Sequence, residues 1–176
     1  MNFENPDPNL FDVRFTIDNR TFYFSKKMLA RHSPVFEALF KTCQNKDHFD
    51  DWQNGLMTAE DFHIFLNTLH GFRCINDSNV EKQLSLGIAS KVDVTVAHCL
   101  DWLMGKETML LEKVKFDLAV KHNLDGLKKK VLSDIESVGD LDDILPADLA
   151  TLDHATSTLV LQRILELTGA RPKESD

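Results

Sequence analysis

Histidine and cysteine are the side chains of this sequence that could bind a metal or act as nucleophiles. The seven histidines form no HxxxH pair, and only His48 and His70 lie two to five residues from a cysteine, Cys43 and Cys74. A structural zinc site usually combines two closely spaced ligand pairs, and neither pair here has a second half-site. The sequence therefore predicts no metal and no other cofactor.

Two further motifs share only part of a catalytic pattern. His32 stands beside Ser33, but the sequence lacks the glycine turn between a strand and a helix that exposes a nucleophilic serine. Because Pro34 follows, Ser33 is interpreted as the N-cap of a helix. Gly105-Lys106 lacks the earlier glycine and the following hydroxyl residue of a phosphate-binding loop. We therefore expect no enzyme.

Charge and hydropathy narrow the classes of partner. The chain has 20 Lys and Arg residues against 28 Asp and Glu, a net charge of −8, which does not attract nucleic acid or anionic membranes. No apolar run is long enough for a spanning helix or has the form of a signal peptide. Three scattered cysteines without a CxxC are typical of reduced thiols. We expect a soluble protein of the cytoplasm, the nucleus or both.

The stretch Asp12 to Phe40 is the one around which the chain is organised. Apolar and polar residues alternate over 13–17 and 22–24, which predicts two antiparallel strands joined by a turn. A short helical turn over 26–31 follows, and Ser33 begins a second helix. We expect the rest of the fold to be organised around this hairpin and helix pair.

Helices dominate the rest of the chain. A loop with a short edge strand is expected over 43–56, and the basic cluster Lys128 to Lys130 is interpreted as the solvated face of a helix rather than a site for an acidic partner. Thr58 with Asp61, and Ser78 with Glu81, have the spacing of capping boxes. Apolar stripes predict helices over 58–72, 78–92, 93–105, 108–122, 125–139 and 155–167.

These elements suggest a division of the chain into four parts. We expect a flexible lead-in over residues 1–11, an α+β module over 12–107, an all-helical extension over 108–169 and a flexible tail over 170–176.

The opening stretch also resembles the BTB/POZ signature. The matching residues are Asp12-Val13, Phe22 to Phe24, Lys27, Leu29, His32-Ser33-Pro34, Phe36 and Leu39-Phe40. Phe116 to Leu127 resembles helices that follow the BTB domain in nematode BTB and MATH-BTB proteins. The resemblance implies an α+β BTB/POZ fold, a small mixed sheet capped by a helical cluster, with a BACK-like C-terminal all-helical extension.

Proteins of that family are docking platforms, so the resemblance implies a protein-binding adaptor. It would recruit a Cul3-type cullin for ubiquitin ligase assembly in the ubiquitin conjugation pathway. Carried over by position, the cullin-facing residues would be Glu60, His63, Ile64, Asn67, Asp101, Trp102 and Lys106. Ile64 and Trp102 are large apolar side chains on otherwise polar faces, as interface anchors are, although each could instead cover neighbouring elements of the fold.

The resemblance also implies dimerisation, with itself or with another BTB protein. The candidate dimer residues are Leu10, Phe11, Met28, Leu29, Ser33, Val35 and Phe36. Many of these must also belong to the core. One alternative is a BTB scaffold that homo- or hetero-dimerises with regulatory proteins without binding cullin, and another is an enzyme or metalloprotein.

Overall fold

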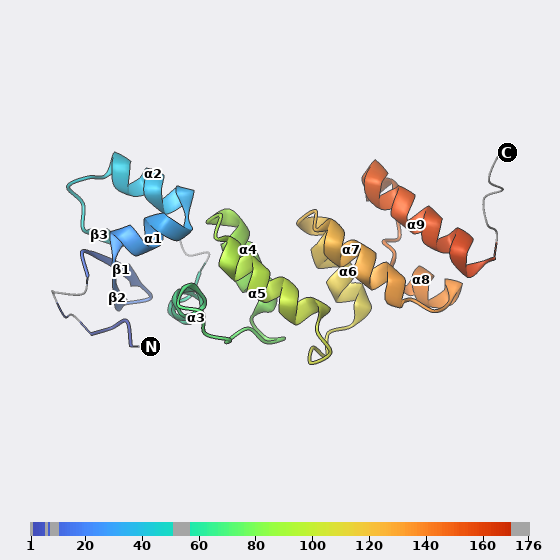
Figure 1. Cartoon of the computed structure of the whole chain (residues 1–176), viewed down its shortest axis with the longest axis horizontal. Coiled ribbons are helices and arrows are strands. Elements are labelled where there is room, and N and C mark those ends of the chain that lie inside the picture. Colours follow the sequence, from blue (N-terminus) through green and yellow to red (C-terminus); the bar gives the residue numbers. More distant parts are fainter. Residues whose placement is uncertain (1, 6, 8–10, 51–56, 170–176) are drawn as a thin grey trace. The chain divides into compact units, whose positions relative to one another are not determined.

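The chain forms two compact units, Met1–Trp102 and Leu103–Asp176, each described here by itself. The structure is a computed structural model that describes residues 2–5, 7, 11–50 and 57–169. Strands and helices make up the described part of the first unit, and helices that of the second (Figure 1).

A small mixed sheet lies at the start of the first unit. Its strands are β1 (Val13–Ile17), β2 (Arg20–Phe24) and β3 (His48–Asp50), in the order β2-β1-β3. β1 pairs antiparallel with β2 and parallel with β3. Asp18 and Asn19 form the turn with φ of 48° and 61°, the left-handed conformation that a two-residue hairpin of this type requires. The predicted hairpin is confirmed, and β3 lies within the segment expected to hold a short edge strand.

Five helices of the described chain begin in this unit. They are α1 (Lys26–His32), α2 (Pro34–Thr42), α3 (Ala59–Leu69), α4 (Val80–Ala89) and α5 (Asp93–Met104). The backbone N–H of Phe36 donates to the Ser33 hydroxyl at 3.1 Å, so Ser33 caps α2 as predicted. Thr58 and Asp61 form the predicted capping box at α3.

Phenylalanine rings fill the core between the sheet and α3. The rings of Phe15 and Phe22, which point inward from β1 and β2, lie 5.4 Å and 5.3 Å from the ring of Phe62 on α3. All three side chains are fully buried. Edge-on and tilted contacts of this kind add to the hydrophobic stabilisation, so α3 is held firmly against the sheet.

The predicted capping box at Ser78 is wrong. Helix α4 has Asn79 at its N-cap, and the Ser78 hydroxyl donates instead to Oδ1 of Asn76 at 2.6 Å. Asn79 is nearly buried, and its side chain binds the backbone N–H of Asn76 and the carbonyl of Cys74. The amide side chain of Asn79 thus orders the loop before α4, which sequence spacing alone did not indicate.

The described part of the second unit consists of short helices around an apolar core. They are α6 (Glu112–Lys121), α7 (Asp125–Asp134), α8 (Val138–Ile144), a 3₁₀ turn η1 (Leu149–Thr151) and α9 (His154–Leu167). Phe116, Leu127, Val131, Leu141 and Val160 are buried in it. A mixed sheet with a helical cluster and a helical C-terminal extension confirms the predicted fold class.

Two helix boundaries in this unit differ from the prediction. α6 begins at Glu112 rather than Thr108, and Leu111 is 73% exposed instead of lying in the apolar stripe. The helix expected over 125–139 is two helices, because Ile135 is extended and Ser137 caps α8. The Ser137 hydroxyl accepts from the backbone N–H three residues later, which starts a new helix.

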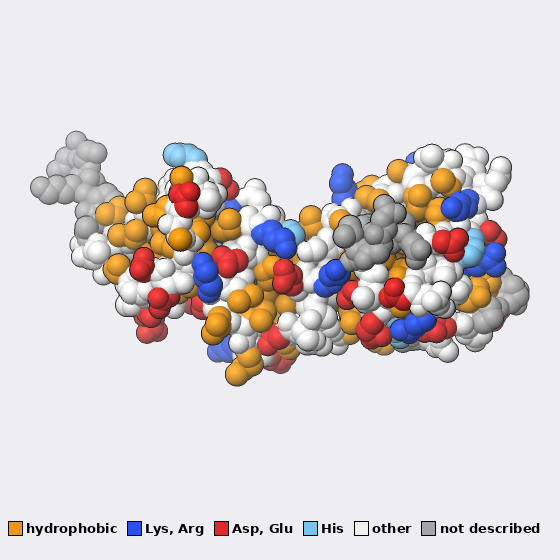
Figure 2. Space-filling view, turned by 180° about the vertical axis from the view of Figure 1, so that it is seen from behind, with side chains coloured by type: hydrophobic (Ala, Val, Ile, Leu, Met, Phe, Trp, Pro, Cys, Tyr) orange, Lys and Arg blue, Asp and Glu red, His pale blue; other side chains and the backbone are white. Residues whose placement is uncertain are grey.

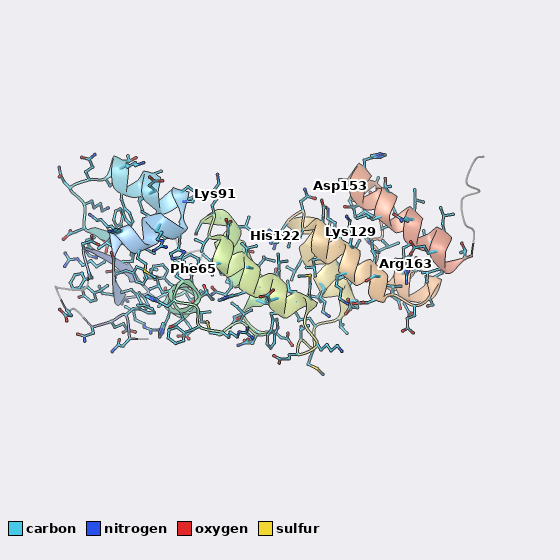
Figure 3. The ribbon with its side chains drawn as sticks, in the orientation of Figure 1. Phe65, Lys91, His122, Lys129, Asp153 and Arg163 are labelled. Atoms are coloured by element: carbon cyan, nitrogen blue, oxygen red, sulfur yellow. The ribbon has the colours of Figure 1, made fainter. Side chains whose placement is uncertain are left out.

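Basic side chains bind the carbonyl ends of helices in this unit. The ammonium of Lys113 donates to the carbonyls of Ile144 and Leu145 at the end of α8, at 2.9 and 3.1 Å. The guanidinium of Arg163, on α9, donates to the carbonyl of Ile135 after α7 at 2.6 Å (Figure 3 labels Arg163). Such contacts satisfy carbonyls that the helices leave unpaired, and they tie successive helices together.

Candidate protein-interaction surface

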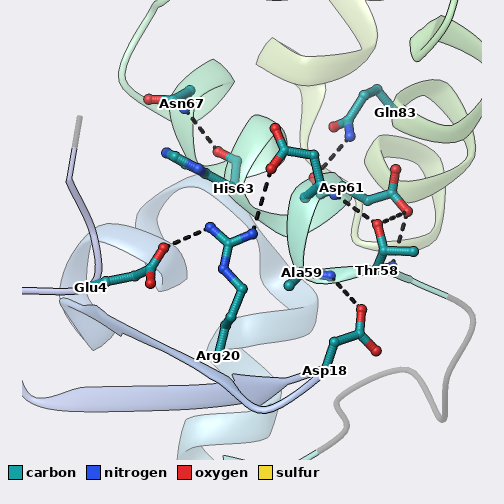
Figure 4. Close-up of polar contacts among 10 residues, drawn as sticks. Glu4, Asp18, Arg20, Thr58, Ala59, Asp61, His63, Asn67 and Gln83 are labelled. Carbon is teal, nitrogen blue, oxygen red and sulfur yellow. Dashed lines mark hydrogen bonds and ion pairs between the residues drawn. The ribbon is translucent and has the colours of Figure 1, made fainter.

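Helix α3 is fixed at its first turn by the hairpin and by α4. The backbone N–H of Ala59 donates to the carboxylate of Asp18 in the hairpin turn at 2.8 Å (Figure 4). The amide of Gln83 on α4 donates to the carbonyl of Asp61 at 2.8 Å. The first turn of α3 is therefore fixed by hydrogen bonds with the hairpin and with α4, and the candidate residues project from the outer face of this helix.

The four candidate residues of α3 differ in exposure. Glu60 is exposed and pairs with Arg20 of β2 at 3.5 Å, whereas His63, Ile64 and Asn67 are half-buried. The Asn67 side-chain amide donates to the His63 carbonyl at 3.0 Å, within the helix. Ile64 is the one large aliphatic side chain among these four, and it is neither core nor fully solvated.

The candidate residues at the end of α5 include a half-buried tryptophan. The indole Nε1–H of Trp102 donates to Oδ1 of Asp77 at 2.8 Å. Asp101 is exposed beside it. Lys106 is also exposed, but it lies in the second unit. The hydrogen bond satisfies the polar edge of the indole and leaves part of its apolar ring accessible.

The loop from α3 to α4 touches both apolar candidates. Near its start, Cys74 Sγ lies 3.6 Å from the carbonyl of Ile64 and from that of Phe72. Further along, Asp77 accepts the hydrogen bond from Trp102. The loop thus contacts the backbone of Ile64 near its start and the indole of Trp102 further along.

Phe72 is a candidate that sequence reasoning missed. It was expected to complete the apolar stripe of α3, but the helix ends at Leu69 and Phe72 is 47% exposed. Gly71 adopts a φ of 79°, the left-handed conformation that glycine takes readily at the end of a helix. The glycine directly before Phe72 was the signal that the stripe should end there.

The first residues of the chain also depart from expectation. Within the lead-in expected to be flexible, Phe3 is 5% exposed, and its ring lies 5.7 Å from His63, 5.3 Å from His70 and 5.5 Å from Phe24. Burial lowers the pKa of His70, with a smaller contribution from the charge of His32. A residue of the lead-in thus covers part of the candidate face of α3.

The candidate dimer residues fall into three groups. Leu10 lies outside the described residues. Leu29, Ser33 and Phe36 are buried, and Ser33 donates to the carbonyl of Ser90 in addition to capping α2. The half-buried ones, which remain accessible, are Phe11, Met28 and Val35.

Phe11 and Met28 border the same groove. It has a volume of about 400 Å³, and its aromatic wall includes Tyr23 of β2, whose ring lies 4.6 Å from that of Phe11. Phe3 and His70 also line it. The structure thus brings two of the candidate dimer residues together beside the N-terminal segment.

Burial favours the neutral form of two of the three cysteine thiols. Burial raises the pKa of the Cys74 thiol and raises that of Cys99 to about 12, which disfavours the nucleophilic thiolate.

Among the residues that the structure describes, no three His, Cys, Asp or Glu side chains gather as a metal site requires. In the same part of the chain, no helix has the length and apolar character needed to cross a bilayer. Acidic and basic side chains are interspersed on the face drawn in Figure 2.

A hairpin with a parallel third strand, covered by paired helices and bearing accessible apolar residues on its flank, defines a protein-interaction domain. The BTB/POZ domain model matches residues 2–106, and the chain belongs to the BTB/POZ domain family. The predicted membership is thereby confirmed. That family is one of protein-protein interaction modules, in which dimerisation is common.

Relatives of the chain occur in Caenorhabditis elegans. It is 26% identical over 163 residues to BTB and MATH domain-containing protein 38, covering 92% of this chain and 42% of that protein. It is 27% identical over 173 residues to BTB and MATH domain-containing protein 36, covering 94% and 52%. The chain therefore spans about half, or less, of the length of these relatives.

Proposed function

We propose that this BTB protein is a dimerising adaptor that recruits a Cul3-type cullin for ubiquitin ligase assembly, in the cytoplasm, the nucleus or both. The observation that carries the proposal is that three large apolar side chains of the first unit, Ile64, Phe72 and Trp102, remain accessible to solvent, and we refer to them as the apolar flank. A few large apolar or aromatic anchors dominate the affinity of most protein interfaces.

The polar residues around these anchors suit the rim of an interface. Glu60 and Asp101 are exposed, and the half-buried Asn67 lies on the same helix as Ile64. Rim residues of this kind contribute more to specificity and association rate than to affinity. A partner surface with basic groups around an apolar centre would complement this arrangement.

The proposal divides the chain into two domains. Residues 12–107 would form the BTB/POZ domain and residues 108–169 a BACK-like helical extension. The end of the family match at residue 106 and the start of the second compact unit at Leu103 support a boundary in this region.

Binding of a cullin N-terminal fragment by the full chain tests the adaptor function. Trp102→Ala and Ile64→Asp should each weaken binding by more than about 1 kcal/mol in isothermal titration calorimetry, because each removes an anchor. Leu161→Asp is the matched control, since Leu161 is 61% exposed on α9 of the second unit. Circular dichroism would establish that each variant is folded.

Two results would contradict the adaptor function. One is a wild-type chain that does not bind the fragment at micromolar concentrations. The other is a Leu161→Asp variant that weakens binding as much as Ile64→Asp, because the effect would then be unrelated to the proposed flank.

The second candidate is a BTB scaffold that dimerises with itself or with regulatory proteins and does not bind cullin. It is favoured by the contacts that already engage the start of the α3 face, where Arg20 pairs with Glu60 and Phe3 packs on His63. A dimer in light scattering that remains indifferent to the cullin fragment would support this function over the first.

A further inference from the structure

We propose that the first unit contains a binding site for an extended peptide in which an aromatic residue is followed by an acidic one. The chain's own residues 2–5, here called the N-terminal clasp, occupy the site in cis. The inference does not require a cullin partner, because it concerns the edge of β2 and the ring slot on α3. The clasp supplies the pattern of the ligand, Phe3 followed by Glu4.

The aromatic position of the site is a slot lined by rings. His63 meets the Phe3 ring edge-on at an interplanar angle of 90°, and His70 stacks on it at 27°. Phe24 closes the slot, with its ring centroid 5.5 Å from that of Phe3. An aromatic side chain bound here gains both hydrophobic burial and ring contacts, so the slot selects an aromatic over an aliphatic residue.

The backbone and charge of the clasp are also recognised. The backbone N–H of Tyr23 donates to the Phe3 carbonyl at 2.7 Å, and β2 is an edge strand of the described sheet. The Arg20 guanidinium pairs with the Glu4 carboxylate at 2.6 Å (Figure 4). Main-chain bonding to a sheet edge, a side-chain slot and one charge pair are the parts of a strand-addition site.

The clasp leaves room beside it for a longer ligand. The groove of about 400 Å³ is lined on one part by the clasp residues Asn2, Phe3 and Asn5 and elsewhere by Phe11, Tyr23 and Met28. The latter three side chains are half-buried and present apolar surface. A peptide that replaces the clasp and continues past the aromatic and acidic residues would also cover the exposed parts of Phe11, Tyr23 and Met28.

A partner peptide must displace the clasp, so the contacts of the clasp within its own chain lower the apparent affinity for the peptide. The Glu4–Arg20 pair is partly exposed, with 42% and 38% of the side chains accessible, so it contributes less than the buried Phe3 ring. Phe3 is therefore the main anchor of the clasp. Removing its ring should open the site to a peptide in trans, because the apparent affinity rises with the fraction of empty sites.

The test uses the full chain and a peptide of residues 1–7, fluorescently labelled at its C-terminus, in anisotropy titrations. The Phe3→Ala chain should bind the peptide at least about fivefold more tightly than the wild-type chain, because the cis competitor is lost. Glu4→Lys, a surface change, should strengthen binding in the same direction without altering the core. A peptide with alanine in place of phenylalanine should not bind.

Charge reversal tests whether the site is specific for the acidic residue of the peptide. In the Phe3→Ala chain, Arg20→Glu should weaken binding of the peptide several-fold, and a peptide with lysine in place of its glutamate should recover affinity. Lys82→Glu on α4 is the charge-matched control and should leave affinity unchanged, since Lys82 is exposed on another element.

Two outcomes would overturn the inference. Equal peptide affinity for the wild-type, Phe3→Ala and Glu4→Lys chains would mean that the clasp does not occupy a peptide site. A wild-type chain with twice the mass of one chain that becomes monomeric on Phe3→Ala, without binding peptide, would assign the clasp to exchange between two copies.

Discussion

At the scale of single residues, Lys128 differs most from its predicted role. Lys129 and Lys130 are exposed as the solvated face of α7 was expected to be, but the Lys128 side chain is fully buried. Its ammonium donates to Asn123 at 2.6 Å and lies 3.6 Å from the carboxylate of Asp153. Asp153 caps the start of α9 and is labelled in Figure 3. As the first of three consecutive lysines, Lys128 gave no signal in the sequence that it joins two helices.

Replacing this buried ammonium should destabilise the chain. Lys128→Ala should lower the free energy of unfolding by about 1–2 kcal/mol, the cost of leaving acceptors unpaired when they are still partly solvated. Urea denaturation followed by circular dichroism measures the change. Lys129→Ala is the matched control and should stay within about 0.5 kcal/mol of wild type. Equal effects of the two substitutions would contradict the structural role of Lys128.

His70 should make stability depend on pH. Because burial lowers its pKa in the folded chain, the unfolded chain binds more protons as pH falls below the ordinary histidine pKa of about 6.5. The free energy of unfolding should therefore fall between pH 7 and pH 5. His70→Phe, which keeps a ring beside Phe3, should show a smaller fall in urea denaturation at the two pH values. Parallel behaviour of wild type and variant would contradict this assignment.

At the scale of elements, local patterns predicted the hairpin and most helices correctly. Alternation over β1 and β2 and the cap at Ser33 depend on neighbours in sequence, so they could be read without the structure. The break between α7 and α8 could not, because the apolar spacing continued through it. Asn79 rather than Ser78 occupies the N-cap position of α4, and its side chain binds two backbone groups of the preceding loop instead of capping the helix.

The packing of α4 on α5 depends on the absence of a side chain at Gly87. A Cβ atom at that position would lie 3.0 Å from a methyl group of Val96 and 3.2 Å from one of Thr95. Gly87→Ala should therefore lower the free energy of unfolding by about 1–3 kcal/mol through overpacking.

Gly126 on α7 is the matched control for that substitution. A Cβ atom there would meet nothing within 4 Å, so Gly126→Ala should be neutral or raise stability by up to about 1 kcal/mol. Thermal unfolding of both variants distinguishes the cases. A stable Gly87→Ala variant would mean that the two helices can separate at little cost.

At the scale of the whole molecule, the candidate surface was only partly predictable. Ile64 and Trp102 were chosen because they are large apolar residues at positions expected to face outward, and both are partly accessible. Phe3 and Phe72 were missed because their positions depend on a distant slot and on a backbone reversal, respectively. Helical spacing in a sequence shows which residues share one face of a helix, whereas an interaction surface combines residues from several elements.

Dimerisation is the property to test at this scale. If the half-buried residues Phe11 and Met28 lie in a dimer interface, the wild-type chain should have twice the mass of one chain in light scattering. Met28→Asp or Phe11→Asp should yield the single-chain mass, because a buried unpaired charge opposes an interface of more than about 1,200 Å². Leu149→Asp is the control, since Leu149 is 54% exposed in the second unit. A monomeric wild-type chain would contradict the prediction.

The hydrogen bond from Trp102 to Asp77 has a consequence for the thermodynamics of association. An accessible indole that is tethered in one rotamer has already lost much of its conformational entropy before any encounter. Immobilising a free side chain at an interface costs about 0.5–1.5 kcal/mol, so a partner that covers this ring would meet little of that penalty.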